Sequence, residues 1–320
     1  MIRHYEPRDF SALHRLWNTA GVRQGYVPAT EPELEALLTG HIWFSQRFAF
    51  VLEQAGALAG FVCGCAGDEL PQGQRRGYFT CLLLDERWET EDNARLLLTA
   101  LEDAFRREGK TQLASTFFNP IHLPWVIPGT QGHQHNNCPG VARDLPLHGW
   151  MVAMGYQVCA GECAMYLDLK NFRLPRSYEE KRLRAGQEGY SIAWYDDRLH
   201  TGLDDMVHAM GNPMWSQEIP VAARTVNMLV ALYGNRVAGF TGPVYPEPTG
   251  RGYFAGIAVA KEHEKHGLGT LLFCRLCQAE QEAGSRYMSL FTGEDNHAQK
   301  IYLSAGFTVR RIFSVMTKEL

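Results

Sequence analysis

A short stretch with two glycines, in the second half of the 320-residue chain, has the composition of a phosphate-binding turn. It stands between an apolar run and a helical pattern and reads Glu264-Lys265-His266-Gly267-Leu268-Gly269-Thr270. The first amides of a helix have no intrahelical partner, and the helix dipole adds about half a positive charge there, so a diphosphate can bind. Lys265 and His266 would add positive potential. A flexible strand-to-helix turn is the alternative explanation of the glycines.

A tyrosine near the end of the chain could supply a proton to a leaving group. Tyr302 follows Asn296, and the pattern predicts a short helix that runs to Ala305, with Asp295 or Asn296 as its cap. Gly306 suits the left-handed end of that helix. A phenol has a pKa of about 10, so the transfer of its proton requires favourable position and timing. The alternative is that Tyr302 is a core residue.

The order and spacing of these two motifs resemble those of the GNAT superfamily, the acyl-CoA-dependent N-acetyltransferases. The phosphate loop of that family reads Gln/Arg-x-x-Gly-x-Gly/Ala, and the chain resembles it at 264–269, with Glu264 in place of the usual first residue. In the family's second motif, an Asn and an Ala lead a helix to a Tyr and then to Gly-Phe. The residues that resemble this motif are Asn296, Ala298, Tyr302, Gly306 and Phe307. The resemblance covers residues 190–320.

The resemblance implies that acetyl-CoA is the co-substrate. In this family the backbone of the strand before the loop bonds the pantetheine arm, and the loop amides bind the diphosphate. The cofactor-binding residues implied in this way are Ile257, Ala258, Val259, Glu264, Lys265, His266, Gly267, Leu268, Gly269, Thr270 and Asn296. Tyr302 resembles the general acid that protonates the CoA thiolate.

The resemblance also implies that the acceptor is a primary amine, carried either by a small molecule or by a peptide. The sequence does not choose between these acceptors. The sequence also does not identify the base that deprotonates the ammonium. The candidates by position are Glu218, Glu262, Glu294 and Asp295. The Pro-rich stretch 242–250 either shapes the acceptor pocket or is a plain connecting loop.

The chain contains an internal repeat. Arg76-Gly77-Tyr78-Phe79 recurs as Arg251-Gly252-Tyr253-Phe254, at an offset of 175 in the numbering. Gly155-Tyr156 matches Gly306-Phe307 at an offset of 151, so the first half contains 24 extra residues. We place the extra residues in a Pro-, Gly- and His-rich stretch at 119–146. Two copies of one fold account for these matches.

The first copy lacks the residues that would bind CoA. At the offset of 175, Gly267 corresponds to Asp92, which has acidic neighbours. Gly269 corresponds to Ala94. Side chains at the glycine positions and negative charges near a diphosphate both disfavour binding. At the offset of 151, the tyrosine corresponds to Met151, which has no dissociable proton. We therefore expect a degenerate first copy and chemistry in the second.

The expected fold class is mixed α/β. It consists of two tandem GNAT folds, each a mostly antiparallel, splayed mixed sheet flanked by helices. The expected domains are a degenerate copy at 1–170 with an inserted loop at about 119–146, a linker at 171–189 with a short helix from Ser177 to Ala185, and an acetyltransferase domain at 190–320.

Hydrophobic patterns predict the elements of the second copy. Gly234-Asn235 marks the turn of a hairpin. The run at 253–259 is apolar enough for a buried strand. Strands are expected at 227–232, 237–241, 253–259, 287–292 and 307–317, with the main helix at 267–283.

The composition argues against several classes of protein. Lys plus Arg total 31 against 35 for Asp plus Glu, a net charge of −4, which offers no basic footprint for nucleic acid. No run approaches the ~18 apolar residues that span a membrane, and the first residues lack the apolar core of a signal peptide. We expect a cytoplasmic protein with neither a nucleic-acid nor a membrane partner.

Cysteine and histidine give no convincing metal site. The eight cysteines are too sparse for a disulfide scaffold. Cys274 and Cys277 lie inside the apolar helix, so we expect them to pack in the core. His133, His135 and Cys138 in the inserted loop have no evident fourth ligand. We therefore expect no metal.

Two rival functions remain open. One is a non-catalytic acyl-CoA-binding module that senses or regulates. The other is a peptide-binding or assembly protein that uses the inserted loop. Loss of turnover on removal of the Tyr302 hydroxyl would favour the enzyme over the first rival.

Overall fold

The computed structural model describes all 320 residues, and the chain divides into two compact units. Unit 1 contains Met1–Ala164 and Arg310–Leu320, and unit 2 contains Met165–Val309. The C-terminal end of the chain is therefore part of the first unit. The segment expected as a linker, 171–189, falls within unit 2. No helix has the length and apolar character that crossing a membrane requires.

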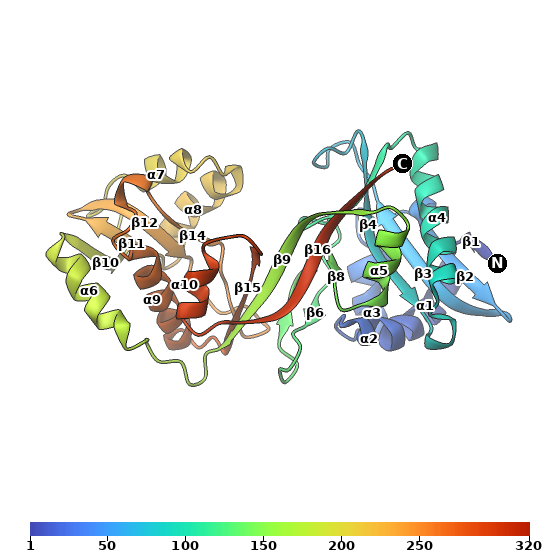
Figure 1. Ribbon diagram of the computed structural model, residues 1–320, viewed down its shortest axis with the longest axis horizontal. Helices are drawn as coiled ribbons and strands as arrows, with labels where there is room; N and C mark the ends of the chain where they lie inside the picture. Colours follow the sequence, from blue (N-terminus) through green and yellow to red (C-terminus); the bar gives the residue numbers. More distant parts are fainter. The chain divides into compact units, whose positions relative to one another are not determined.

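Unit 1 is built on one mixed sheet (Figure 1). β4 and β5 run parallel, whereas β4 is antiparallel to β3 and β5 is antiparallel to β16. The parts of β9 and β16 that belong to this unit are 157–164 and 310–319. In spatial order the strands are β1 (Ile2–His4), β2 (Ala49–Gln54), β3 (Ala57–Cys65), β4 (Arg76–Leu84), β5 (Gln112–Ser115), β16 (Thr308–Glu319) and β9 (Gln157–Asp168).

Two apolar cores fill the two faces of this sheet, because successive side chains of a strand point to opposite faces. Leu82 and Leu84 pack under α4 and α5, whereas Cys81 and Leu83 pack under α1 and α3. The helices of unit 1 are α1 (Phe10–Leu16), α2 (Val22–Gln24), α3 (Glu31–Leu34), α4 (Glu91–Arg107) and α5 (Pro146–Ala153).

The inserted stretch 119–146 is packed into unit 1. Trp125 is 1% exposed, and its indole N–H donates to the carbonyl of Asn137 at 2.8 Å. Its short strands are β6 (Trp125–Val126), β7 (Gln134–His135) and β8 (Val141–Ala142), of which β8 pairs with β16. Because these residues belong to the core, deleting the stretch would damage the fold of unit 1.

The C-terminal strand completes the sheet of unit 1. Met316 of β16 pairs with Ser115 of β5 and has no exposed surface. Two residues further on, Lys318 donates to both carboxylate oxygens of the buried Glu102 at 2.8 Å, and Tyr156 donates to the same carboxylate at 2.9 Å. The fold of the first half of the sequence therefore requires the last residues of the chain.

Met316→Ala should destabilise unit 1 by about 2–5 kcal/mol, because it leaves a cavity in the core beside β5. Val158→Ala on the neighbouring strand β9 is the matched control, since Val158 also belongs to unit 1, is 46% exposed and should cost well under 1 kcal/mol. Urea unfolding of both variants measures the difference. Equal effects of the two substitutions would contradict the role of β16 in the core.

Unit 2 contains two sheets that diverge. One is antiparallel, in the order β10 (Tyr190–Trp194), β11 (Leu229–Tyr233), β12 (Arg236–Gly242) and β14 (Gly256–Val259). In the other, β15 (Tyr287–Gly293) lies between β13 (Arg251–Gly252), to which it is parallel, and the end of β9, residues 165–168. β14 pairs with β12 along one edge, and no strand covers its other edge.

Helices cover both faces of the antiparallel sheet (Figure 1). α7 and α8 share a core with Phe240 of β12. The neighbouring Gly239 faces α9, because a Cβ there would lie 3.2 Å from Leu272. The helices are α6 (Ser177–Gln187), α7 (Leu203–Ala209), α8 (Pro213–Thr225), α9 (Leu268–Glu282) and α10 (Gln299–Ser304).

The expected mixed α/β class, with a mixed sheet flanked by helices, is confirmed, and so are most of the expected elements of the second copy. β11 and β12 form the predicted hairpin, and α9 and β15 end within a residue or two of the expected limits. The helix predicted at 177–185 is α6, and Cys274 and Cys277 are fully buried as expected.

The strand predicted at 253–259 is wrong in its length and burial. β14 begins only at Gly256, and Ile257 to Val259 are partly exposed. The residues before it leave the sheet because their backbone bonds elsewhere. The amide of Tyr253 donates to Tyr245, and the carbonyl of Ala255 accepts from the Trp215 indole.

The repeat in the sequence corresponds to a repeat in strand register. Gly77 of β4 lies opposite Leu113 of β5, and Gly252 of β13 lies opposite Met288 of β15. Both members of the second pair follow those of the first at the offset of 175 seen in the sequence. A Cβ on Gly77 would lie 2.6 Å from Phe105, and one on Gly252 would lie 2.8 Å from Glu280. Phe105 and Glu280 are related by the same offset, so the glycines of the two copies face equivalent positions.

Candidate active site

The uncovered edge of β14 forms one wall of a pocket of about 400 Å³. The start of α9 and one face of α10 form the other walls. The lining residues are Ile257, Ala258, Val259, His263, Glu264, Lys265, Gly267, Leu268, Gly269, Thr270, Ala298 and Ile301. The structure thus brings together all the residues expected to bind the cofactor except His266 and Asn296.

The start of α9 leaves three backbone amides without an intrahelical partner. Gly267 precedes the helix with φ of +75°, a conformation that glycine adopts without strain. The first intrahelical bond runs from the amide of Leu271 to the carbonyl of Gly267, so the amides of Leu268, Gly269 and Thr270 remain free. No side chain caps this end of the helix. It can therefore accept an anion.

Gly269 allows α10 to approach the start of α9. A Cβ at Gly269 would lie 3.0 Å from Cδ1 of Ile301, which is tighter than an ordinary contact. Ile301 and Ala298 thereby form the apolar side of the pocket, opposite the backbone of β14. One wall of the pocket is therefore polar backbone and the opposite wall is apolar.

Of two histidines near the pocket, the one expected to bind the cofactor lies outside the pocket lining, and the other, for which the sequence predicted no role, lines it. His266 lies outside the pocket lining and bonds the carboxylate of Glu188 at 2.5 Å through Nδ1. This bond holds the pKa of Glu188 below its usual range. His263, which the motif did not single out, lines the pocket and shares a 3.0 Å hydrogen bond with the Tyr190 hydroxyl. A loop motif fixes backbone positions but not the side-chain partners that lie 70 or more residues away.

Asn296 lies two residues before the N-cap of α10, which is Ala298, and no side chain caps this helix, so the cap expected at Asp295 or Asn296 is wrong. The side-chain oxygen of Asn296 accepts from the amide of Ala298 at 2.9 Å. The side chain is exposed and lies outside the pocket lining. Asn296 therefore positions α10, whose residues Ala298 and Ile301 do line the pocket.

Tyr302 packs against aromatic rings on the α9 side of the sheet. Its ring lies 4.7 Å from that of Phe273 and 6.2 Å from that of Phe254, measured between centroids, and the residue is 6% exposed. Burial raises the pKa of its phenol to about 12. The hydroxyl makes no hydrogen bond within the protein and is not sealed from solvent. Tyr302 therefore combines a core ring with an available proton.

The four candidate bases differ in their surroundings. Glu262, Glu294 and Asp295 are exposed on the surface. Glu218, on α8, is partly buried, and one of its carboxylate oxygens accepts a 2.7 Å hydrogen bond from the Tyr253 hydroxyl. These surroundings do not select a base among the four.

A buried carboxyl group holds the Pro-rich loop 242–250. Glu280 of α9 has no exposed surface, accepts from the amide of Tyr245 at 3.1 Å and accepts from the Ser285 hydroxyl at 2.5 Å. Burial is the main cause that raises the pKa of Glu280 to about 7. Its place below Gly252 is taken in unit 1 by Phe105. The loop therefore depends on a polar contact that unit 1 lacks.

The free energy of unfolding of the parent protein should fall as the pH rises, because Glu280 is buried, and Glu280→Gln should remove that fall. The folded-state pKa lies above the ordinary value of 4.5, so this group's contribution is full below pH 4.5 and is lost as the pH rises to about 7. The loss amounts to about 3 kcal/mol at most. Glutamine stays neutral and keeps an acceptor oxygen. Urea unfolding at pH 5 and pH 8 measures the difference in the free energy of unfolding between the two pH values. Glu180→Gln is the surface control. An unchanged pH dependence in Glu280→Gln would refute this role.

Comparison with known proteins agrees with this geometry. Residues 194–307 match the model of the acetyltransferase (GNAT) family. That segment contains the whole pocket and Tyr302. A comparison with curated proteins gave no match.

Solved GNAT structures share the fold over the whole chain. A GCN5-related glucosamine N-acetyltransferase region of a fungal multi-domain β-N-acetylglucosaminidase aligns with a TM-score of 0.66 at 14% identity; 99% of this chain and 38% of that one are covered. For a GCN5-related N-acetyltransferase from Sphaerobacter thermophilus, the TM-score is 0.60 at 14% identity, with 100% and 95% coverage. A tandem GNAT protein from the clavulanic acid biosynthesis pathway gives 0.56 at 16% identity, with 100% and 98% coverage.

In unit 1, the groups that correspond to the pocket walls of unit 2 bond to the protein itself. Leu82 and Leu84 of β4 correspond to Ile257 and Val259. The carbonyl of Leu82 accepts from the side chain of Gln24, and that of Leu84 accepts from Arg23, both at 3.0 Å. Two carbonyls of β4 in unit 1 are therefore already bonded to side chains.

The start of α4 in unit 1 is likewise capped. The Thr90 hydroxyl accepts from the amide of Asn93 at 3.3 Å. Glu91 and Asp92 place two negative charges in the first turn. An anion would meet a capped helix end and two carboxylates, in contrast to the free amides of α9.

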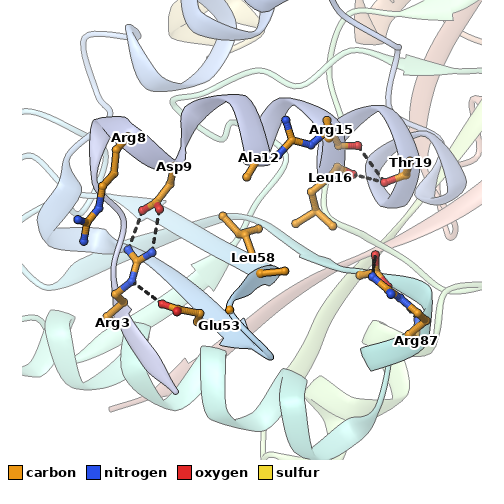
Figure 2. A pocket seen from close by; sticks show the side chains of 13 residues that line it. Arg3, Arg8, Asp9, Ala12, Arg15, Leu16, Thr19, Glu53, Leu58 and Arg87 are labelled. Carbon is orange, nitrogen blue, oxygen red and sulfur yellow. Dashed lines mark hydrogen bonds and ion pairs between the residues drawn. The ribbon is translucent and has the colours of Figure 1, made fainter.

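A separate cavity of unit 1 is lined by ion pairs. It has a volume of about 520 Å³ and lies beside α1 and the β2–β3 turn (Figure 2). Arg3 donates to Asp9 at 2.7 Å and to Glu53 at 3.1 Å, and Arg87 pairs with Asp85 at 3.0 Å. Carboxylates already neutralise these guanidinium groups. The cavity lacks the free helix amides that characterise the pocket of unit 2.

Proposed function

We propose that the protein is an acetyl-CoA-dependent N-acetyltransferase whose unit 2 transfers an acetyl group to a primary amine. The observation that carries the proposal is that an uncovered strand edge and an uncapped helix start line one pocket. The strand edge can bond the amides of a pantetheine arm, and the helix start can bind a diphosphate. The GNAT match over 194–307 supports the same ligand.

The residues of the pocket divide the binding task. The backbone of Ile257 to Val259 would bond the pantetheine, and the amides of Leu268 to Thr270 would bond the diphosphate, with Lys265 adding positive charge. When bound, acetyl-CoA supplies an acetyl group activated as a thioester. The hydroxyl of Tyr302 holds the proton available to the departing thiolate. With its pKa raised to about 12, that phenol stays protonated throughout the physiological range.

Unit 1 is proposed as a degenerate partner that does not bind CoA. Its equivalent strand edge bonds Arg23 and Gln24, and its equivalent helix carries a cap and two acids. The counterpart of Tyr302 is Met151, which is fully buried in an apolar core. These contacts support a role in the fold and not in the chemistry.

Gly267→Asp should strongly weaken acetyl-CoA binding, because it introduces the residue found in unit 1 and sets a carboxylate against the diphosphate. A loss on the order of 100-fold is expected from a like charge at this distance. Gly284→Asp is the matched control, since Gly284 also has positive φ, lies in open space and follows the far end of α9. Calorimetry should find one site per chain. Two sites would refute the degenerate role of unit 1, and none would refute the proposed function.

Tyr302→Phe should lower kcat by about 100-fold with little change in acetyl-CoA affinity, because it removes the proton and keeps the ring packing. CoA release measured with a panel of amines, together with calorimetry, separates these effects. Unchanged turnover would refute the general-acid role. If the parent protein binds acetyl-CoA but releases no CoA with any amine, a non-catalytic acyl-CoA-binding module would be favoured.

A further inference from the structure

Glu218 presents a carboxylate that no cation balances. It lies on α8, and its Oε1 accepts from the Tyr253 hydroxyl at 2.7 Å, while Oε2 has no partner. Arg251, which follows the Pro-rich loop, forms an ion pair with Glu247 at 2.6 Å. Burial is the main cause that raises the pKa of Tyr253, and the neighbouring Glu218 contributes. A fixed carboxylate with one free oxygen is suited to receive a positive group from a ligand.

Two stacked tyrosine rings adjoin this carboxylate. Tyr245 and Tyr253 lie 4.8 Å apart between centroids, with 15° between their planes. Tyr245 is 36% exposed, and its backbone is held by the buried Glu280. The faces of phenol rings attract cations, and more strongly when water is partly excluded. Glu218 and the two rings together form a surface that favours a positive charge.

Trp215 connects this surface with the pocket wall. It precedes Glu218 by one turn of α8, and its indole donates to the carbonyl of Ala255 at 3.1 Å. A Cβ on Gly256 would lie 2.4 Å from the Trp215 ring, so the ring lies directly on the start of β14. Tyr253 precedes Ile257 by four residues, a span of at most about 14 Å.

Unit 1 lacks the same arrangement. Its equivalent of Tyr253 is Tyr78, which is 2% exposed and donates its hydroxyl to the backbone carbonyl of Pro71. A neutral carbonyl therefore takes the place of the Glu218 carboxylate. The arrangement with a carboxylate therefore occurs in unit 2, which contains the candidate active site.

We propose that Glu218 and the ring faces of Tyr245 and Tyr253 bind a positively charged group of the acceptor, so that the acceptor is an amine with a second cationic group. The second charge would lie beside the start of β14, where the Trp215 ring contacts Gly256. This inference rests on the proposed function. In it, Glu218 determines specificity and does not take the proton.

Glu218→Gln tests the proposal, since it removes the charge and keeps the acceptor for the Tyr253 hydroxyl. The probes are spermidine, which carries several charges, and nonylamine, a chain of the same length with one. Calorimetry and CoA release are measured for each. Glu218→Gln should weaken spermidine binding and raise its KM by at least 10-fold, with kcat and the nonylamine values unchanged. The exposed Glu180, on α6, provides the control Glu180→Gln, which should change nothing.

The outcomes separate this inference from the proposed function. Spermidine binding that depends on Glu218, without CoA release from any amine, would retain the cation site and refute the acetyltransferase. CoA release with no preference for spermidine over nonylamine, or no spermidine binding, would refute the cation site alone. An equal fall in kcat for both amines, with a shifted pH profile, would make Glu218 the base and overturn the anchoring role. Thermal melting verifies that each variant folds.

Discussion

The edge of β14 that no strand covers is the constraint on which the rest of the structure depends. Backbone N–H and C=O groups away from bulk water require partners, and a neighbouring strand usually supplies them. In unit 2, β15 belongs to a different sheet, so the groups of Ile257 to Val259 face a pocket instead. The free amides at the start of α9 face the same pocket. A ligand with amide groups at one end and a diphosphate at the other satisfies both.

Unit 1 has the same frame and satisfies its groups internally. The register of β4 with β5 in unit 1 and that of β13 with β15 in unit 2 agree at an offset of 175 in the numbering. The difference lies in a few side chains. Arg23 and Gln24 bond the strand edge, and Thr90 caps the helix. A small number of hydrogen bonds thus separates a unit with a binding pocket from a unit whose equivalent groups are already paired.

The sequence predicted the parts of the site that depend on local pattern. Glycine spacing predicted the start of α9, and the apolar period predicted its length. Contacts between distant residues were beyond its reach. Nothing in the sequence indicated that His266 would bond Glu188, or that the Glu218 carboxylate would meet the Tyr253 hydroxyl. Likewise, the pairing of Met316 with Ser115 joins residues about 200 positions apart, and its free energy depends on tertiary packing.

Amide hydrogen exchange with and without acetyl-CoA tests the central claim most directly, because it reports on the backbone groups themselves. Binding is predicted to slow exchange at Ile257 to Val259 and at Leu268 to Thr270, and to leave Leu82 to Leu84 and the start of α4 unchanged. Slower exchange at those positions of unit 1, or none along β14, would contradict the account.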